Sequence, residues 1–503
     1  MNALSDDSLD HHHWMGAVLV VLIGVFLSIL SSSIVNVAIA SIMTVFNTDT
    51  AGVQWVSTAY MLAMAMIIPM SGWMSDKWGL KTVYLASMAA FTAGSVICAA
   101  AWNLESLIVA RVLQALGGGL MSPLVMAMIY RLVPRRQIGA GMGIMGMALL
   151  VAPAVGPTLG GWLVEYVNWR WIFLINLPLG IVGVVLGFFF IPEFQKEPVG
   201  KLDIPGAVTA AVGFAGLLFV LSKGNEWGWN SEATVLTLVA SVGVLVLFVL
   251  VELWSPSPLL DVKVFAYPSF TFANITVGIT TIGMFAALFY IPLFLQSVRG
   301  MGAMETGLVM FPAAIASACV MPVAGKLFDR FGPRVVIVVG LGSMALVTWM
   351  LAGICLDTSV LTVTWWLVWR GLAMGLCMMP AQTAALNDIP VAMVSRASSV
   401  SNLIRNVASS FGVAIMTVLM NQRSLFHKAQ LTETLNSDNP AFVGWMGANS
   451  TAGSTLLTGQ ISKQAYVLSI QDVFLLTSIF TLLAIVPALF LQKVQKTKPA
   501  LPG

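Results

Sequence analysis

The chain has 503 residues, of which 58% are hydrophobic and only 9% are charged, with a formal net charge of +3 and a mean hydropathy of +0.91. A soluble globular chain carries roughly a quarter of charged residues, so this composition excludes an ordinary soluble domain and makes the lipid bilayer the main partner. The 24 Lys and Arg are dispersed, which argues against a nucleic-acid surface. The four Cys lie in apolar runs and no Walker A sequence occurs, so we expect no disulfide framework, metal site, cofactor or ATP-driven enzyme.

Apolar runs of 18 or more residues recur along the chain, each long enough to cross a hydrocarbon core of about 30 Å. They must be helices, because only helices and closed barrels satisfy every backbone group in lipid. We expect an all-α membrane protein of about fourteen spans. In chain order they lie near residues 16–43, 53–72, 82–101, 105–130, 138–164, 170–191, 205–221, 233–253, 270–296, 304–325, 335–355, 360–386, 397–420 and 470–491.

Two charged segments between these runs repeat one pattern, GWMSDKWGLK at residues 72–81 and GKLFDRFGPR at residues 325–334. Two copies in corresponding places indicate an internal duplication, which is how many secondary transporters are built. The pattern is a Gly, an Asp four residues later, a basic residue, a second Gly and a closing basic residue. Its positions are Gly72, Asp76, Lys77, Gly79 and Lys81 in the first copy, and Gly325, Asp329, Arg330, Gly332 and Arg334 in the second.

The positions of Lys and Arg predict the orientation, since cytoplasmic loops carry an excess of these residues. With the N-terminus inside, fifteen of the 24 lie in cytoplasmic loops and tails, six lie outside and three lie within spans. The reverse orientation inverts this bias. We therefore expect a multi-pass protein of the cell (inner) membrane with both termini and both charged segments in the cytoplasm.

The duplication also sets the expected domain organisation. The charged segments join spans 2 and 3 and spans 10 and 11, so spans 1–6 and 9–14 are equivalent halves with two helices inserted between them. The expected ranges are an N-terminal tail 1–15, a first half 16–191, an insertion with linkers 192–267, a second half 268–491 and a C-terminal tail 492–503. A polar segment at about 421–469 is expected as an outer loop.

Three charges are expected well within spans, Arg111, Arg370 and Arg405. An ionised group there is costly and is by default a functional residue, although an Arg that only binds backbone carbonyls and holds helices together is the alternative. Arg111 and Arg370 occupy corresponding places in the two halves. We expect no carboxylate or His in mid-span; the acids near predicted span starts, where they complement the helix dipole, are Glu105, Glu232, Glu305 and Asp472.

Span 5 contains APAVGPTLGG at residues 152–161, in which small residues recur every four positions. Such a helix face lets two backbones approach closely, and its prolines can bend the helix. Ordinary helix packing explains the same pattern. Upstream in this span, Gly141, Gly143 and Gly146 match a dinucleotide fingerprint, but no strand precedes them, so we interpret them as helix packing.

Taken together, these motifs resemble the major facilitator superfamily, and within it the fourteen-span drug:proton antiporters of the EmrB/QacA type. The charged segments look like its signature loop, residues 152–161 look like its antiporter motif, and RVLQALGG from Arg111 resembles its span-4 motif, with Gln114 included. Three further segments support the resemblance: WRWIFLINLPLG at 169–180, RASSVSNLIRN at 396–406, and HKAQLTE at 427–433, which is closest to the EmrB branch.

The resemblance implies two six-helix halves that alternate access, and it implies roles for individual residues. Asp76 and Asp329 would form a charge latch at the inward gate, where the simpler alternative is a helix-start charge worth about 0.3–1 kcal/mol. The antiporter motif would form a second gating element through Pro153, Gly156, Pro157, Gly160 and Gly161.

Span 1 departs from the resemblance. The family usually has a Leu-Asp-x-Thr run there, whereas this chain reads LSSSIVNVAIA, with Ser31 in place of the Asp. Ser31 cannot carry the charge of the expected proton and cation site. Asn36 remains a polar candidate for the transport pathway, and coupling would be weak or would use an acid at the mouth such as Glu305.

The expected function is export of small amphipathic or lipophilic compounds, with proton antiport implied by the resemblance. An exporter of anionic or lipid-like molecules is the alternative, because every mid-span charge is Arg. A membrane receptor or scaffold that kept the fold and lost transport is a third possibility. If the likeness to the EmrB branch extends to assembly, a periplasmic adaptor protein is a further partner.

Overall fold

The computed structural model describes residues 13–48, 50–134, 137–196, 200, 202–255, 258–390, 393–434 and 450–491, and every regular element in these ranges is helical. Thirteen of the described helical segments are long and apolar enough to cross a membrane. The predicted span near 270–296 corresponds to a further helix of 26 residues, α11, about 39 Å long. The all-helical fold is therefore confirmed within the described residues, and the thirteen candidate spans together with α11 agree with the predicted total of about fourteen.

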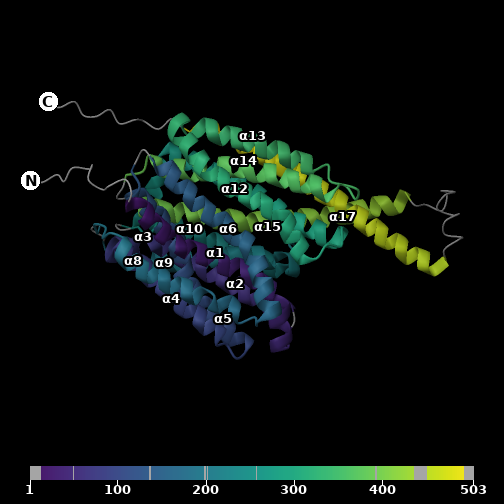
Figure 1. Cartoon of the computed structure of the whole chain (residues 1–503), viewed down its shortest axis with the longest axis horizontal. Helices are drawn as coiled ribbons and strands as arrows, with labels where there is room; N and C mark the ends of the chain where they lie inside the picture. Colours follow the sequence, from purple (N-terminus) through teal and green to yellow (C-terminus); the bar gives the residue numbers. More distant parts are fainter. Residues whose placement is uncertain are drawn as a thin grey trace, which may run out of the picture.

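The first half begins with α1 and ends with α8, and its helices lie side by side in Figure 1. The second span consists of α2, the short η1 and α3 in direct succession. The elements of this half are α1 (His13–Phe46), α2 (Thr50–Ile67), η1 (Ile68–Met70), α3 (Ser71–Trp78), α4 (Leu80–Ala99), α5 (Leu104–Leu132), α6 (Ile138–Tyr166), α7 (Trp171–Leu174) and α8 (Asn176–Phe190).

The second half repeats this succession from α11 to α18. Its elements are α11 (Pro268–Leu293), η4 (Phe294–Val298), α12 (Ala303–Phe331), α13 (Pro333–Leu351), α14 (Val360–Asn387), α15 (Val394–Thr434), α17 (Ser450–Leu483) and α18 (Ile485–Leu489). One buried hydrophobic cluster continues across both halves, with Met128 and Met142 from the first and Phe328 and Ala384 from the second. The halves thus share a core.

Two inserted helices, α9 (Ile204–Trp227) and α10 (Glu232–Trp254), separate the halves in the sequence, and η3 (Val262–Ala266) follows them. The α9 helix packs on α2 of the first half, where the rings of Phe219 and Trp55 stack at 5.8 Å. It also packs on α15 of the second half, where Leu217 and Leu221 form a hydrophobic cluster with Ala414. The insertion therefore covers one side of the seam between the halves.

The two charged segments fold in the same way, as the duplication predicts. Gly79 ends α3 with a φ of 94°, and Gly332 ends α12 with a φ of 84°; glycine adopts such left-handed values without the steric cost of a Cβ. The basic residue two positions later is tied to the last span of its own half in each case. Lys81 Nζ lies 3.5 Å from Glu193 Oε1, after α8. Arg334 Nε donates to the carbonyl of Leu491, after α18.

We call the end of the bundle that holds both charged segments the signature end. At the other end, the segment predicted as an outer loop (about 421–469) is largely helical where described, because α15 continues to Thr434 and α17 begins at Ser450. These two helices project beyond the other spans in Figure 1. Asp472, expected near the start of a span, lies well inside α17. Residues 435–449 and most of the two predicted tails lie outside the described residues.

Candidate transport site and the seam between the halves

Arg111 lies on α5 in the interior of the first half and is 1% exposed. Its guanidinium donates to Ser31 Oγ on α1 (3.1 Å), to Gln114 Oε1 (2.6 Å) and to the Val56 carbonyl on α2 (3.2 Å). The ring of Tyr60 stacks below it, with Cζ 3.8 Å from the ring centroid. Ser31, at the place of the family's Asp, is therefore a direct ligand of this buried cation.

The polar network continues from Arg111 toward α4 and α8. Gln114 Nε2 donates to Ser95 Oγ at 2.6 Å, and Asn176 Nδ2 donates to the same oxygen at 3.4 Å. The Asn176 Oδ1 atom is buried without a hydrogen-bond partner among the described residues. Arg111 takes part in none of the ion pairs that the described residues form, so neutral acceptors and an aromatic ring stabilise its charge.

Arg370 occupies the corresponding place on α14, but its surroundings differ. It donates from Nη2 to the Met284 carbonyl on α11 at 3.3 Å, and its buried Nε has no hydrogen-bond partner among the described residues. This arrangement agrees with the alternative of an Arg that ties helices together through a backbone carbonyl.

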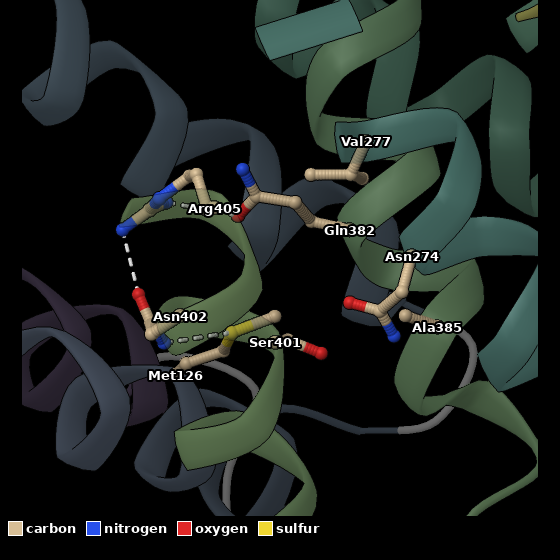
Figure 2. Close-up of a pocket in the computed structure, with 8 residues that line it drawn as sticks. All are labelled: Met126, Asn274, Val277, Gln382, Ala385, Ser401, Asn402 and Arg405. Atoms are coloured by element: carbon tan, nitrogen blue, oxygen red, sulfur yellow. Dashed lines mark hydrogen bonds between the residues drawn. The ribbon is translucent and has the colours of Figure 1, made fainter. Parts of the chain in front are cut away.

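Arg405 on α15 stands where the two halves meet. Its Nη2 donates to Ser122 Oγ on α5 of the first half (3.2 Å) and to Asn402 Oδ1 on its own helix (2.6 Å). Its Nη1 donates to Gln382 Oε1 on α14 at 3.4 Å. Figure 2 shows Arg405, Asn402 and Gln382 around a pocket that is also lined by Met126, Asn274, Val277, Ala385 and Ser401.

At the signature end, backbones of the two halves approach so closely that only glycine fits. A Cβ on Gly325 of α12 would lie 2.0 Å from the Gly139 carbonyl oxygen of α6, and a Cβ on Gly139 would lie 2.4 Å from that of Gly325. A Cβ on Gly72 of α3 would likewise lie 3.1 Å from the Cα of Arg396 on α15. The first Gly of each charged segment therefore packs on the beginning of a helix in the other half.

The two acids of the charged segments also reach across the seam, to different partners. Asp76 is 3% exposed, and its Oδ2 forms an ion pair with Arg396 Nε at 3.2 Å. Asp329 accepts a hydrogen bond from the backbone N–H of Gly139 at 3.2 Å, at the start of α6. The predicted latch residues thus both lie at the seam, but only Asp76 has a basic partner there among the described ion pairs.

Other predicted site residues lie around these clusters. The antiporter motif packs inside the first half, since a Cβ on Gly156 or Gly160 would meet Ser33 and Ile34 of α1. The α6 helix runs uninterrupted through Pro153, Pro157 and Gly161. On α6, the glycines facing the second half are Gly139, Gly143 and Gly146, the latter two against Met321. The remaining predicted residues, Asn36, Lys77 and Arg330, are exposed. The Asn36 Oδ1 atom accepts a hydrogen bond from Ser57 Oγ, and the Lys77 ammonium lies over the Trp73 ring.

Sequence reasoning missed the neutral polar residues of the seam, namely Ser122, Asn274, Gln382, Ser401 and Asn402. The motif RASSVSNLIRN places Ser401, Asn402 and Arg405 within one turn of helix, and residues three or four positions apart share a helix face. This spacing was the available signal. Sequence reasoning also missed a charged cluster at the opposite end of the bundle. There, His427 Nε2 lies 2.7 Å from Asp472 Oδ2, and Arg423 Nε lies 3.5 Å from the same oxygen.

Comparison with known proteins identifies the family to which this architecture belongs. The family model described as Major Facilitator Superfamily matches residues 21–413. The chain is 32% identical over 499 residues to the uncharacterized MFS-type transporter YhcA of Bacillus subtilis, covering 96% of this chain and 94% of that protein. It is 30% identical to the Multidrug resistance protein B homolog of Mycobacterium tuberculosis, covering 92% of this chain and 87% of that protein.

A solved structure of the proton:xylose symporter XylE shares the fold with a TM-score of 0.60, at 13% identity and with 93% of this chain and 95% of that chain covered. The resemblance inferred from the motifs is thereby confirmed. The helical spans, the two charged segments and the family match over residues 21–413 all lead to the same conclusion. This many-span membrane protein belongs to the Major Facilitator Superfamily.

Proposed function

We propose that this protein exports small amphipathic or lipophilic compounds by proton antiport, with access alternating between its two halves. The observation that carries the proposal is the seam at the signature end. Beside the hydrophobic core that the halves share, the described residues join them there through the Asp76–Arg396 ion pair, hydrogen bonds such as that between Ser71 and Ser399, and glycine contacts at equivalent positions of the halves. Contacts of this kind can separate as a unit, which alternating access between two repeats requires.

The distribution of Lys and Arg supports placing the signature end in the cytoplasm, with both termini on that side of the cell membrane. The conformation described above is then closed toward the cytoplasm, as an exporter is when it releases its substrate outward. Similarity to the Multidrug resistance protein B homolog of Mycobacterium tuberculosis supports drug efflux as the function of this chain too.

The proton needs a titratable group, and Ser31 does not supply one. We place the coupling site at Asp472 and His427, whose 2.7 Å contact joins α17 to α15 at the end opposite the signature end. The third charged group in this cluster is Arg423. Glu305, the other mouth acid considered, accepts a hydrogen bond from the Gly302 N–H at the start of α12, so its carboxylate has a structural use.

Reconstituted vesicles test the proposal. We expect a lipophilic fluorescent substrate to drive proton movement in the opposite direction, and an imposed pH gradient to drive substrate uptake against its own gradient. Asp472→Asn should abolish this coupling, whereas Asp357→Asn, at an exposed site between α13 and α14, should leave it intact. Uptake driven by membrane potential alone would reject antiport, and the absence of any transport would favour the receptor or scaffold alternative.

A further inference from the structure

The pocket beside Arg405 contains three buried polar atoms that bind nothing in the described structure. These are Gln382 Nε2, Asn274 Oδ1 and Ser401 Oγ, and their side chains belong to residues that are 3%, 2% and 6% exposed. In Figure 2 they belong to residues that surround one space, with Arg405 at its edge. A buried polar atom without a partner costs about 1–3 kcal/mol, so these three atoms require polar partners, which buried water or the polar groups of a bound molecule can supply.

The chemistry of the pocket selects the charge of that molecule. Arg405 supplies guanidinium donors, Gln382 Nε2 and the Ser401 hydroxyl can add two more, and the residues that line the pocket include no carboxylate. Asn274 Nδ2 already donates to the Phe270 carbonyl at 2.9 Å, so its Oδ1 is left as a free acceptor, and the Ser401 hydroxyl can accept as well as donate. An anion with an adjacent hydroxyl or N–H group satisfies all of them, and a guanidinium matches a carboxylate particularly well.

An apolar compartment adjoins the pocket. It is lined by Val277, which it shares with the pocket, by Thr280 and Thr281, and by four methionines, Met284, Met344, Met374 and Met378. Methionine side chains are flexible and polarizable, so they adapt to apolar molecules of different shapes. The compartment would therefore receive the lipophilic part of a molecule whose charged group lies beside Arg405.

The bonds of Arg405 couple this site to the seam. In the closed conformation described here, its Nη2 donates to Ser122 Oγ of the first half at 3.2 Å, and the following steps are inferred from that bond. When the halves separate, that acceptor is lost and the guanidinium gains access to a replacement from the cytoplasmic side. When the signature end closes again, Ser122 returns to Arg405 and displaces the substrate group that had taken its place. Binding from the cytoplasm followed by displacement on closure is the order of events that export requires.

We propose that this pocket binds the anionic group of an amphipathic substrate, which exchanges with Ser122 for Arg405 as the signature end opens and closes. The inference rests on the proposed export function, for which it names the substrate class. It assigns functions to Gln382, Ser401 and Asn274 that the charge pattern of the chain does not reveal.

Binding of matched probes to the full chain in lipid nanodiscs tests the site without relying on transport. The probes are 1-pyrenebutyrate, its neutral methyl ester and the corresponding butylammonium, followed by pyrene anisotropy against empty nanodiscs. We expect the anion to bind best. Arg405→Gln should weaken its binding by roughly 10-fold or more, the loss typical of a hydrogen bond to a charged group, and leave the other two probes unchanged. Arg405→Lys should retain part of the preference.

Two further variants keep the test decisive if Arg405→Gln does not fold. Ser122→Ala removes the competing acceptor and should tighten anion binding, and Gln382→Leu should weaken it. Lys263→Gln neutralises an exposed charge away from the pocket and should change nothing. Equal binding of anion and ammonium, or equal losses for all probes in Arg405→Gln, would overturn the inference while vesicle export could still stand. An Arg405-dependent anion preference without export would support the site and reject the proposed function.

Discussion

Replacing Asp76 with Asn should open the signature end far more than the same replacement of Asp329, although the two acids occupy equivalent places in the repeat. Asp76 loses an ion pair with Arg396 whose atoms lie 3.2 Å apart. At an effective dielectric constant of about 20, the attraction between unit charges at this distance is about 5 kcal/mol. Most of it is offset by desolvation, and the Arg396 side chain is 21% exposed, so water can partly solvate the freed guanidinium.

We therefore take the net loss as about 1.5–3 kcal/mol, the range for a hydrogen bond to a charged group. This corresponds to a shift of roughly 10- to 160-fold in the ratio of closed to open protein. Asp329→Asn should shift the ratio by less than about 3-fold, because an Asn side-chain oxygen can still accept the hydrogen bond from the Gly139 N–H. The two substitutions differ in effect because Asp76 binds a guanidinium whereas Asp329 binds a backbone N–H, although both acids occupy the same position of the motif.

The assay is a distance distribution between spin labels at Lys77 and Arg330, which are exposed on opposite sides of the seam, in a background without the four native Cys. Asp76→Asn should enrich the long distance, Arg396→Gln should do the same, and the double variant should add little to either. Equal shifts for Asp76→Asn and Asp329→Asn would refute the reasoning, as would additive effects of Asp76→Asn and Arg396→Gln.

Two other substitutions probe the seam and the first half. Gly325→Ala should block closure and lower transport at least about 10-fold, because its Cβ would lie 2.0 Å from the Gly139 carbonyl oxygen. The control is Gly342→Ala, which has no atom near its Cβ and should retain activity. Wild-type transport rates in both variants would contradict the packing account. Ser31→Asp should place a carboxylate beside Arg111 and increase proton-coupled uptake in vesicles, and unchanged coupling in a folded variant would show that this position no longer serves the proton.

The sequence allowed the helical spans and the equivalence of the two charged segments to be predicted, because each depends on local chemistry. A long apolar run must be a helix in lipid, and a repeated motif reports an equivalent fold wherever it occurs. Hydropathy failed to predict the helical ends of α15 and α17, since a polar helix that projects from the bundle has the composition of a loop. Asp472 was assigned to a helix start for the same reason.

The partners of the seam could not be predicted, because each contact joins residues that are far apart in the chain. Asp76 and Arg396 are separated by 320 positions, and nothing near Asp329 indicates that its partner is a backbone amide of α6. Ser122 and Gln382 are neutral, so they do not stand out from the small and polar residues that pack ordinary helices. The charge of Arg405 is evident in the sequence, whereas its acceptors are defined only by the three-dimensional packing of α5, α14 and α15.

The three mid-span arginines show how a duplicated fold can assign different roles to one residue type. A buried guanidinium without an acid needs neutral acceptors, and the origin of those acceptors decides what happens when the halves move. Arg111 draws all of its described acceptors from the first half, so it can keep them throughout the cycle. Arg405 takes Ser122 from the first half and Gln382 and Asn402 from the second, so under the proposed cycle it must change partners. Gly139 of α6 and Arg396 of α15 are equivalent positions, because each packs against the first Gly of the charged segment in the other half. Nine residues beyond them lie Ala148 on α6 and Arg405 on α15. The first half therefore has no arginine at this position, and the exchange of partners proposed for Arg405 belongs to the second half alone.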